Sequence, residues 1–170
     1  MTLTVRLAVQ DDAALLPDIE RSAGTLFRTL PDLARIADDG VMSVETHEQF
    51  IRAGTCWVAD DGRLIGFIST EIFDPELHIW EISVSAYHHR RGIGQRLIAA
   101  AISHARYTDC VAVTLTTFRN VGWNEPYYAR LGFETLSAET LCPRLRAVLE
   151  GETKKGLPIA QRCAMRLGIN

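Results

Sequence analysis

The chain has 170 residues, of which 47% are hydrophobic and 23% are charged, and its formal net charge is −3. This length and composition predict an ordinary globular protein with one domain over residues 1–170. The slightly acidic balance argues against a nucleic-acid partner, which requires a basic surface. The sequence has no signal-peptide core and no run of 18 apolar residues, so we expect a cytoplasmic protein with no membrane partner.

The cysteines and histidines indicate no metal site. Four cysteines lie far apart without a Cys-x-x-Cys pair, which predicts reduced and mostly buried thiols. None of the five histidines stands at finger-like spacing from a cysteine pair, so no zinc site is expected. We expect His88 and His104 at the surface. The cysteines are Cys56, Cys110, Cys142 and Cys163.

The N-terminal part predicts one strand followed by helices. Alternating apolar residues favour a strand over 2–9. Asp11 and Asp12 can cap a helix over 13–23, in which Pro17 marks a second start or a kink. Further helical stretches are expected over 24–40 and 43–53.

The middle of the chain predicts a hairpin and then a long strand. Asp60-Asp61-Gly62 between two apolar runs is typical of a β-turn joining strands 56–59 and 64–72. A turn at 74–76 leads into a strand over 77–84. The later patterns predict helices over 95–106, 127–131 and 141–149, and strands over 111–117, 134–136 and 159–167. With hairpins early and crossovers late, the fold class is α/β (α+β), with a mixed, mostly antiparallel central sheet flanked by helices.

The most informative segment is the basic, glycine-containing turn His88–Gly94. A strand precedes it and a helix follows it, so free N–H groups at the helix start and the helix dipole favour an anion there. Arg90 and Arg91 add positive charge in a geometry suited to phosphate. We therefore predict a ligand that carries phosphate or pyrophosphate; the alternative is a solvated basic loop.

Two common phosphate-binding motifs fit this turn poorly. A Walker loop needs Gly-Lys-Ser/Thr, which occurs nowhere in the chain. A dinucleotide-binding turn needs a third glycine, but that position is Leu97, and Thr114 stands where an acidic residue is expected.

A third motif fits. His89–Gly94 resembles the Gln/Arg-x-x-Gly-x-Gly/Ala signature of the GCN5-related N-acetyltransferases, with His89 in place of the usual Gln or Arg. The later stretch 116–134 is similar to a second signature of that family, since Tyr128 stands four residues before Gly132-Phe133. The upstream Asn-x-x-Ala spacing is altered, because Asn124 occupies the slot where alanine is frequent.

The resemblance implies an acetyltransferase fold in which two central strands splay apart, with acetyl-CoA as co-substrate and no metal. Unpaired N–H groups near Val84 would then hold the acetyl carbonyl and the pantetheine amides. The cofactor-binding residues that it implies are Ile82, Ser83, Val84, His89, Arg90, Arg91, Gly92, Ile93, Gly94, Gln95, Arg96, Asn120, Asn124 and Tyr128.

Two residues are candidates for the chemistry. Strand alternation places Glu81 on a polar face with Ser83 and Ser85, opposite Trp80, Ile82 and Val84, so Glu81 is the candidate base that deprotonates the amine. The alternative is an ordinary solvent-facing glutamate. The candidate acid is Tyr128, whose alternative is a packed aromatic, a role that we expect Tyr127 to fill. Asn124 is expected to bind the pantetheine arm or to cap the following helix.

The resulting functional hypothesis is an N-acetyltransferase that moves an acetyl group from acetyl-CoA to a primary amine by direct attack in a ternary complex. The acceptor is a small-molecule amine or a peptide N-terminus. The alternatives are a non-catalytic acyl-CoA-binding sensor of the same fold and a nucleotide-binding module. The resemblance is also compatible with a homodimer.

Overall fold

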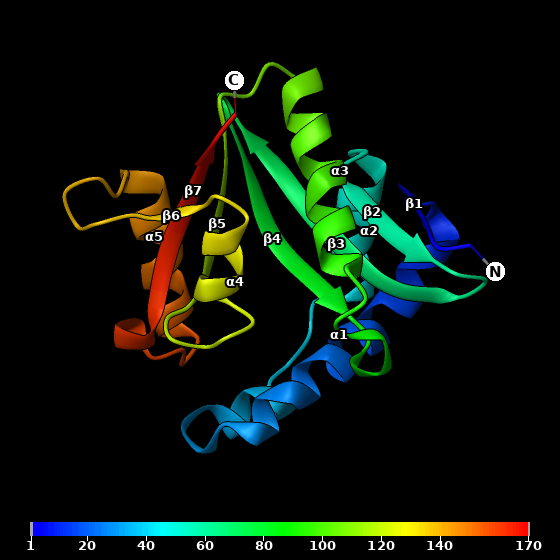
Figure 1. Cartoon of the computed structure of the whole chain (residues 1–170), viewed down its shortest axis with the longest axis horizontal. Coiled ribbons are helices and arrows are strands. Elements are labelled where there is room, and N and C mark those ends of the chain that lie inside the picture. The colour runs from blue at the N-terminus through cyan, green and yellow to red at the C-terminus, as the bar shows by residue number, and fades with distance from the viewer. Residues whose placement is uncertain (1, 170) are drawn as a thin grey trace. The chain divides into compact units, whose positions relative to one another are not determined.

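The computed structural model describes residues 2–169, and these form a seven-stranded sheet in the order β1-β2-β3-β4-β5-β7-β6 (Figure 1). The pairs β1–β2, β2–β3, β5–β7 and β6–β7 are antiparallel, whereas β4 and β5 are parallel. The prediction of a mixed, mostly antiparallel sheet is therefore confirmed. The strands are β1 (Thr4–Leu7), β2 (Cys56–Asp60), β3 (Leu64–Phe73), β4 (Glu76–Val84), β5 (Ala112–Phe118), β6 (Glu134–Thr135) and β7 (Arg162–Gly168).

The helices follow the predicted order with different boundaries. The expected helix over 24–40 is two 3₁₀ helices, because Leu30 is extended before Pro31 and a residue that precedes proline avoids the α conformation. The second helix start expected at Pro17 is confirmed, since this residue lies in the first turn of α1. The α-helices are α1 (Leu16–Gly24), α2 (Val44–Arg52), α3 (Ile93–Tyr107), α4 (Glu125–Arg130) and α5 (Pro143–Lys154). The 3₁₀ helices are Gln10–Leu15, Thr25–Thr29, Pro31–Asp38, Ala86–His88 and Ile159–Gln161.

The chain folds into two compact units. The first unit consists of the residues up to Glu71 together with Trp80–His104, and the second consists of Ile72–Ile79 with the residues from Ala105 onward. Strand β4 therefore begins in the second unit and ends in the first. The single domain expected over 1–170 stays a prediction.

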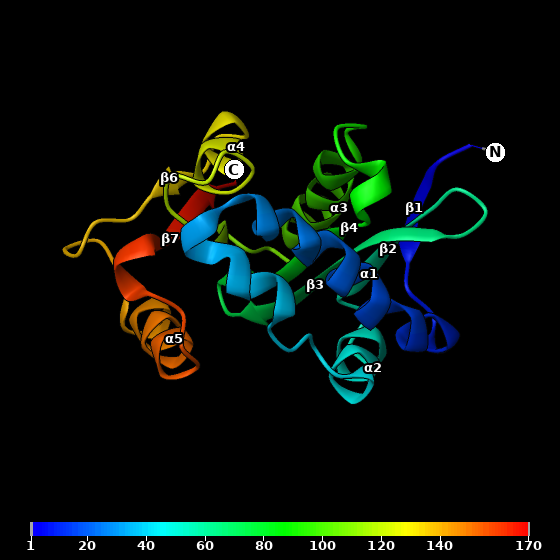
Figure 2. The same cartoon turned by 90° about the horizontal axis from the view of Figure 1, so that it is seen from below.

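The first unit buries an apolar core beneath its helices. Figure 2 shows α3 on one side of β2 and β3, with α1 and α2 on the other. Leu16 and Ile19 of α1 pack with Val58 of β2 and Phe67 of β3. The expected hairpin is confirmed, and at its turn the N–H of Gly62 donates to Asp60 Oδ1 over 2.9 Å. The helix predicted over 95–106 is confirmed as α3, and its apolar face is buried at Leu97, Ile98, Ala101 and Ala105.

The second unit is built around β5 and β7, with α4 and α5 on opposite sides of these strands (Figure 2). Leu145 and Leu149 of α5 pack on Ala164 of β7. Glu76, at the start of β4, accepts hydrogen bonds from Arg144 over 2.8 Å and from Arg166 over 2.9 Å. Burial alone would raise the pKa of Glu76, but these two guanidinium groups outweigh it and hold the pKa below its usual value. This charge cluster fixes α5 to the strands.

Candidate functional site

The turn between β4 and α3 has the backbone of an anion-binding loop. Arg90 and Gly92 both take positive φ, at 63° and 73°. Alternation of left-handed residues with ordinary ones turns successive N–H groups toward one side of the chain, and Gly92 adopts this conformation without a Cβ clash. Helix α3 then begins at Ile93, two residues earlier than predicted. Ile93 and Gly94 therefore belong to the first turn of the helix.

The start of α3 offers donors to a ligand. The first intrahelical bond runs from the N–H of Arg96 to the carbonyl of Gly92 over 3.1 Å. The N–H groups of the three preceding residues, 93–95, therefore have no acceptor within the helix. Arg90 and Arg91 are exposed beside them. This combination of free N–H groups, helix dipole and two guanidinium groups suits a diphosphate.

His89 replaces the usual signature residue and anchors the turn to the end of β4. Its Nε2 lies 2.7 Å from the carbonyl oxygen of Val84. A carbonyl only accepts, so Nε2 carries the proton in this contact. The imidazole thus links the loop to the last residue of β4, and the departure from the family signature keeps a donor at this position.

Glu81 and Ser83 interact on the β4 segment that belongs to the first unit. The Ser83 hydroxyl donates to Glu81 Oε1 over 2.7 Å, with Ser83 buried and Glu81 half-buried. Ile82 and Val84 are also half-buried. The carboxylate is therefore oriented by a neighbouring hydroxyl, and its role as a base stays a prediction.

The expected division of β4 into an apolar and a polar face needs correction. Trp80, placed on the apolar face, is exposed, and its indole N–H donates to Glu71 Oε2 over 2.7 Å. Ser83, placed on the polar face, is 4% exposed. Both differences arise from neighbouring residues, since Trp80 finds a polar partner at the surface and Ser83 finds one in Glu81.

Tyr128 lies within α4, in the second unit. It is 7% exposed, and its ring makes edge contacts with Tyr127 at 5.3 Å and Phe133 at 5.8 Å between centroids. The expectation that Tyr127 is the packed member of the pair is wrong: Tyr127 is half-buried, with Arg130 over its ring. Burial raises the pKa of the Tyr127 phenol, and Arg130 opposes this shift. The predicted helix stop at Gly132 is confirmed.

Asn120 and Asn124 of the second unit differ in their surroundings. Asn120 is exposed with a positive φ of 57°, and its N–H donates to Glu125 Oε2 over 3.4 Å. Asn124 occupies the N-cap position of α4, but its side chain makes no capping hydrogen bond. The Asn124 Nδ2 is buried without a hydrogen-bond partner among residues 2–169. An unpaired buried amide is costly, and a ligand acceptor would satisfy it.

Sequence reasoning missed a cavity in the first unit, because its walls come from three separate segments. It also placed His88 at the surface, whereas this residue is 6% exposed and lines the cavity. His104 is half-buried against the Trp57 ring, 5.1 Å away between centroids. The only signal in the sequence was the presence of the polar residues Ser85, Tyr87 and His88 between the strand and the basic turn.

The described residues contain no group of three or more His, Cys, Asp or Glu that could hold a metal ion. Among residues 2–169, no helix is both long and apolar enough to cross a membrane.

A mixed seven-stranded sheet flanked by helices, with an anion-binding turn between its fourth strand and the next helix, defines an acetyltransferase fold. Residues 52–135 match the family model described as an acetyltransferase (GNAT) domain. Residues 52–135 are therefore assigned to the GCN5-related N-acetyltransferase (GNAT) superfamily.

Solved structures share this fold over the whole chain. The PaiA N-acetyltransferase of Thermoplasma acidophilum, solved with coenzyme A, is 16% identical with a TM-score of 0.73, over 99% of this chain and 100% of that one. Ard1 of Thermoplasma volcanium is 16% identical with a TM-score of 0.71, over 100% of this chain and 99% of that one. The N-acetylglutamate synthase of Neisseria gonorrhoeae, solved with coenzyme A and N-acetyl-glutamate, is 21% identical with a TM-score of 0.71. That similarity covers 100% of this chain and 36% of the synthase.

Proposed function

We propose that this protein transfers an acetyl group from acetyl-CoA to a primary amine. The observation that carries the proposal is the turn before α3, where free N–H groups at 93–95 stand beside Arg90 and Arg91. That arrangement suits the pyrophosphate of coenzyme A. Two of the similar structures hold coenzyme A, which supports the same donor.

The residues proposed to hold acetyl-CoA are Ile82, Ser83 and Val84 of β4 and the turn and helix start over 89–96. The unpaired Nδ2 of Asn124 would donate a hydrogen bond to an amide carbonyl of the pantetheine arm. Asn120 and Tyr128 complete the proposed set.

The reaction proceeds by direct attack in a ternary complex. The amine nitrogen forms a bond to the thioester carbonyl carbon, and the carbon–sulfur bond breaks. Glu81 takes the proton that the amine loses, directly or through water, and Tyr128 returns a proton to the departing thiolate. Backbone N–H groups near Val84 stabilise the developing charge on the carbonyl oxygen.

The buried thiols make a cysteine acyl-enzyme a poor alternative. Burial raises the pKa of both Cys56 and Cys163 to about 11. A thiol must ionise to attack a thioester, so neither side chain is a good nucleophile near neutral pH. An acyl-enzyme on Cys56 or Cys163 is therefore disfavoured.

A thiol-release assay over amines, amino acids and peptides tests this function. Amino acids and peptides belong in the panel because one similar structure is an N-acetylglutamate synthase. We expect coenzyme A release that depends on an amine. Saturable acetyl-CoA binding without release for any amine would contradict transfer and favour a sensor, and competition by ATP or NAD in place of coenzyme A would favour a nucleotide-binding module.

Two substitutions test the proposed roles. Glu81→Gln should lower kcat by about 100-fold or more and remove the acidic limb of the pH profile, because the variant lacks a base. Tyr128→Phe should lower kcat with little change in the KM for acetyl-CoA. Glu150→Gln and Tyr107→Phe, at exposed positions of α5 and α3, serve as matched controls. Full activity in either test variant would refute the corresponding role.

A further inference from the structure

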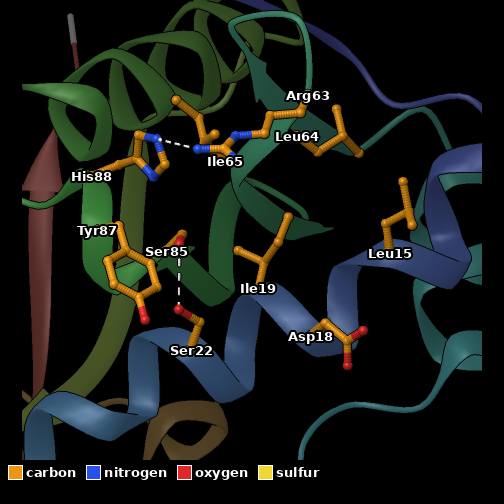
Figure 3. Close-up of a pocket in the computed structure, with 10 residues that line it drawn as sticks. All are labelled: Leu15, Asp18, Ile19, Ser22, Arg63, Leu64, Ile65, Ser85, Tyr87 and His88. Carbon is orange, nitrogen blue, oxygen red and sulfur yellow. Dashed lines mark hydrogen bonds between the residues drawn. The ribbon is translucent and has the colours of Figure 1, made fainter.

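A cavity of about 330 Å³ lies in the first unit, and none of its lining residues is among those proposed to hold acetyl-CoA (Figure 3). Its walls come from the Gln10–Leu15 and α1 segments, from the start of β3, and from the residues just after β4. Its volume lies at the lower end of the range for small-molecule sites. The cavity is therefore a separate candidate site.

One side of the cavity carries a positive charge. Figure 3 shows Arg63 and His88 facing each other, with 3.4 Å between the Arg63 Nη2 and the His88 Nε2. A guanidinium has only donors, so Nε2 accepts in this contact and the ring proton lies on Nδ1. His88 is only 6% exposed, and its buried Nδ1 has no hydrogen-bond partner within residues 2–169. The cavity wall thus contains an unsatisfied buried donor.

The Arg63 guanidinium has further donors available for a ligand. Among the ion pairs of the described residues, none joins Arg63 to a carboxylate. Its contact with His88 engages one of five N–H groups. The planar fork of a guanidinium matches the two oxygens of a carboxylate. The charge and donor geometry of this wall therefore favour an anion.

Part of the cavity lining is apolar. Ile19 of α1 and Ile65 of β3 are buried at 7% and 2% exposure, and Leu64 lies beside them. The Ser22 and Ser85 hydroxyls lie 3.3 Å apart, and Ser22 Oγ also accepts the N–H of Ala86 over 3.1 Å (Figure 3). These hydroxyls are already paired with each other. The Asp18 carboxylate also lines the cavity and forms an ion pair with Arg21, so the remaining lining offers mainly hydrocarbon contacts.

We propose that this cavity binds a small organic carboxylate with a branched or compact apolar body. The carboxylate lies on the Arg63 guanidinium, and the apolar body lies against Ile19 and Ile65. Charge and hydrocarbon are both required, because a guanidinium alone would bind any anion weakly in water. Apolar walls alone would not distinguish a carboxylate from its amide.

Isothermal titration of the full chain with 4-methylpentanoate tests this proposal without acetyl-CoA, so its outcome is independent of the acetyl-transfer assay. We expect saturable binding with one site. The amide 4-methylpentanamide, which keeps the apolar body and loses the charge, should bind at least about tenfold more weakly. Inorganic phosphate, which keeps the charge and lacks the apolar body, should also bind at least about tenfold more weakly.

The matched variants are Arg63→Gln in the cavity and Arg52→Gln at an exposed position of α2. Arg63→Gln should weaken 4-methylpentanoate binding by about tenfold or more, and Arg52→Gln should leave it unchanged. Equal affinity of the Arg63→Gln variant and the parent would overturn the proposal. If that variant does not fold, the comparison of carboxylate with amide on the unaltered chain decides, and equal affinity or no saturable binding rejects the site.

Discussion

Because it has no side chain, Gly66 of β3 allows the backbone of β4 to approach closely. A Cβ built at this position would lie 3.0 Å from the carbonyl oxygen of Ser83, 3.3 Å from Val84 Cγ2 and 3.4 Å from Leu97 Cδ1. The first of these atoms is backbone and cannot rotate away. Gly66→Ala must therefore shift β4 by a few tenths of an ångström at Ser83, within the segment proposed to bind acetyl-CoA.

The expected magnitude follows from two opposing effects. Overpacking in a buried position costs about 1–3 kcal/mol. Replacing glycine by alanine lowers the entropy of the unfolded chain and recovers about 0.4–1 kcal/mol. The free energy of unfolding should therefore fall by about 1–2 kcal/mol, which corresponds to a decrease in Tm of about 2–8 °C for a chain of this size. The KM for acetyl-CoA should rise, because β4 is displaced next to Val84.

Gly151→Ala provides the matched control. Gly151 lies within α5, its φ is not in the left-handed region, and a Cβ there meets no atom within 4 Å. Alanine should stabilise this helix by about 0.5–1 kcal/mol. Thermal and urea unfolding of both variants, with the KM for acetyl-CoA, measure the effects. A Gly66→Ala variant as stable as its parent, with an unchanged KM, would refute the reasoning from close approach.

Three further predictions concern charge, the turn and the thiols. Glu76→Gln should lower stability at pH 7 by about 2 kcal/mol, since it leaves two guanidinium groups without their carboxylate. The pKa of Glu76 is lower in the folded state than in the unfolded state. Its carboxylate therefore contributes to the free energy of unfolding above the unfolded pKa, and this contribution is lost as the pH falls through the folded pKa. The difference in Tm between Glu76→Gln and the parent should accordingly shrink in acid. His89→Ala should raise the KM for acetyl-CoA about threefold to tenfold, and His89→Gln, which keeps a donor, should raise it less; equal KM values in all three proteins would argue against the anchoring bond. A thiol reagent at pH 8 should label the half-buried Cys142 in the native protein and spare Cys56 and Cys163, whose thiols have a pKa of about 11. Labelling of Cys56 and Cys163 as rapid as that of Cys142 would contradict the burial of these two thiols.

Local signals in the sequence predicted much of the fold. The Asp-Gly turn placed the β2–β3 hairpin, and the apolar spacing after Gly94 placed α3. The anion-binding turn was predicted because glycines and a helix start act through backbone geometry, which nearby residues determine. Where Pro31 interrupts a helical pattern, the same local reasoning could have found the break.

Contacts between distant segments could not be predicted. His88 looked like a surface residue because nothing near it in sequence indicates Arg63, which lies 25 residues away. Tyr127 and Tyr128 are adjacent residues of the same type, so the sequence does not show which of them is buried; in the structure it is Tyr128, which packs against Phe133. The cavity was missed for the same reason, since it exists only after three segments meet.

The change of unit within β4 has a consequence for the order in which the chain can fold. No single break separates the two units, because the chain passes between them after residues 71, 79 and 104. The second unit begins with the segment 72–79, whose parallel partner Ala112–Leu115 is synthesised more than thirty residues later. A chain still growing on the ribosome therefore carries the first half of β4 without its parallel partner until α3 and β5 have emerged. A fragment that ends at His104 would contain that segment without β5, so we expect the two units to form together rather than in sequence.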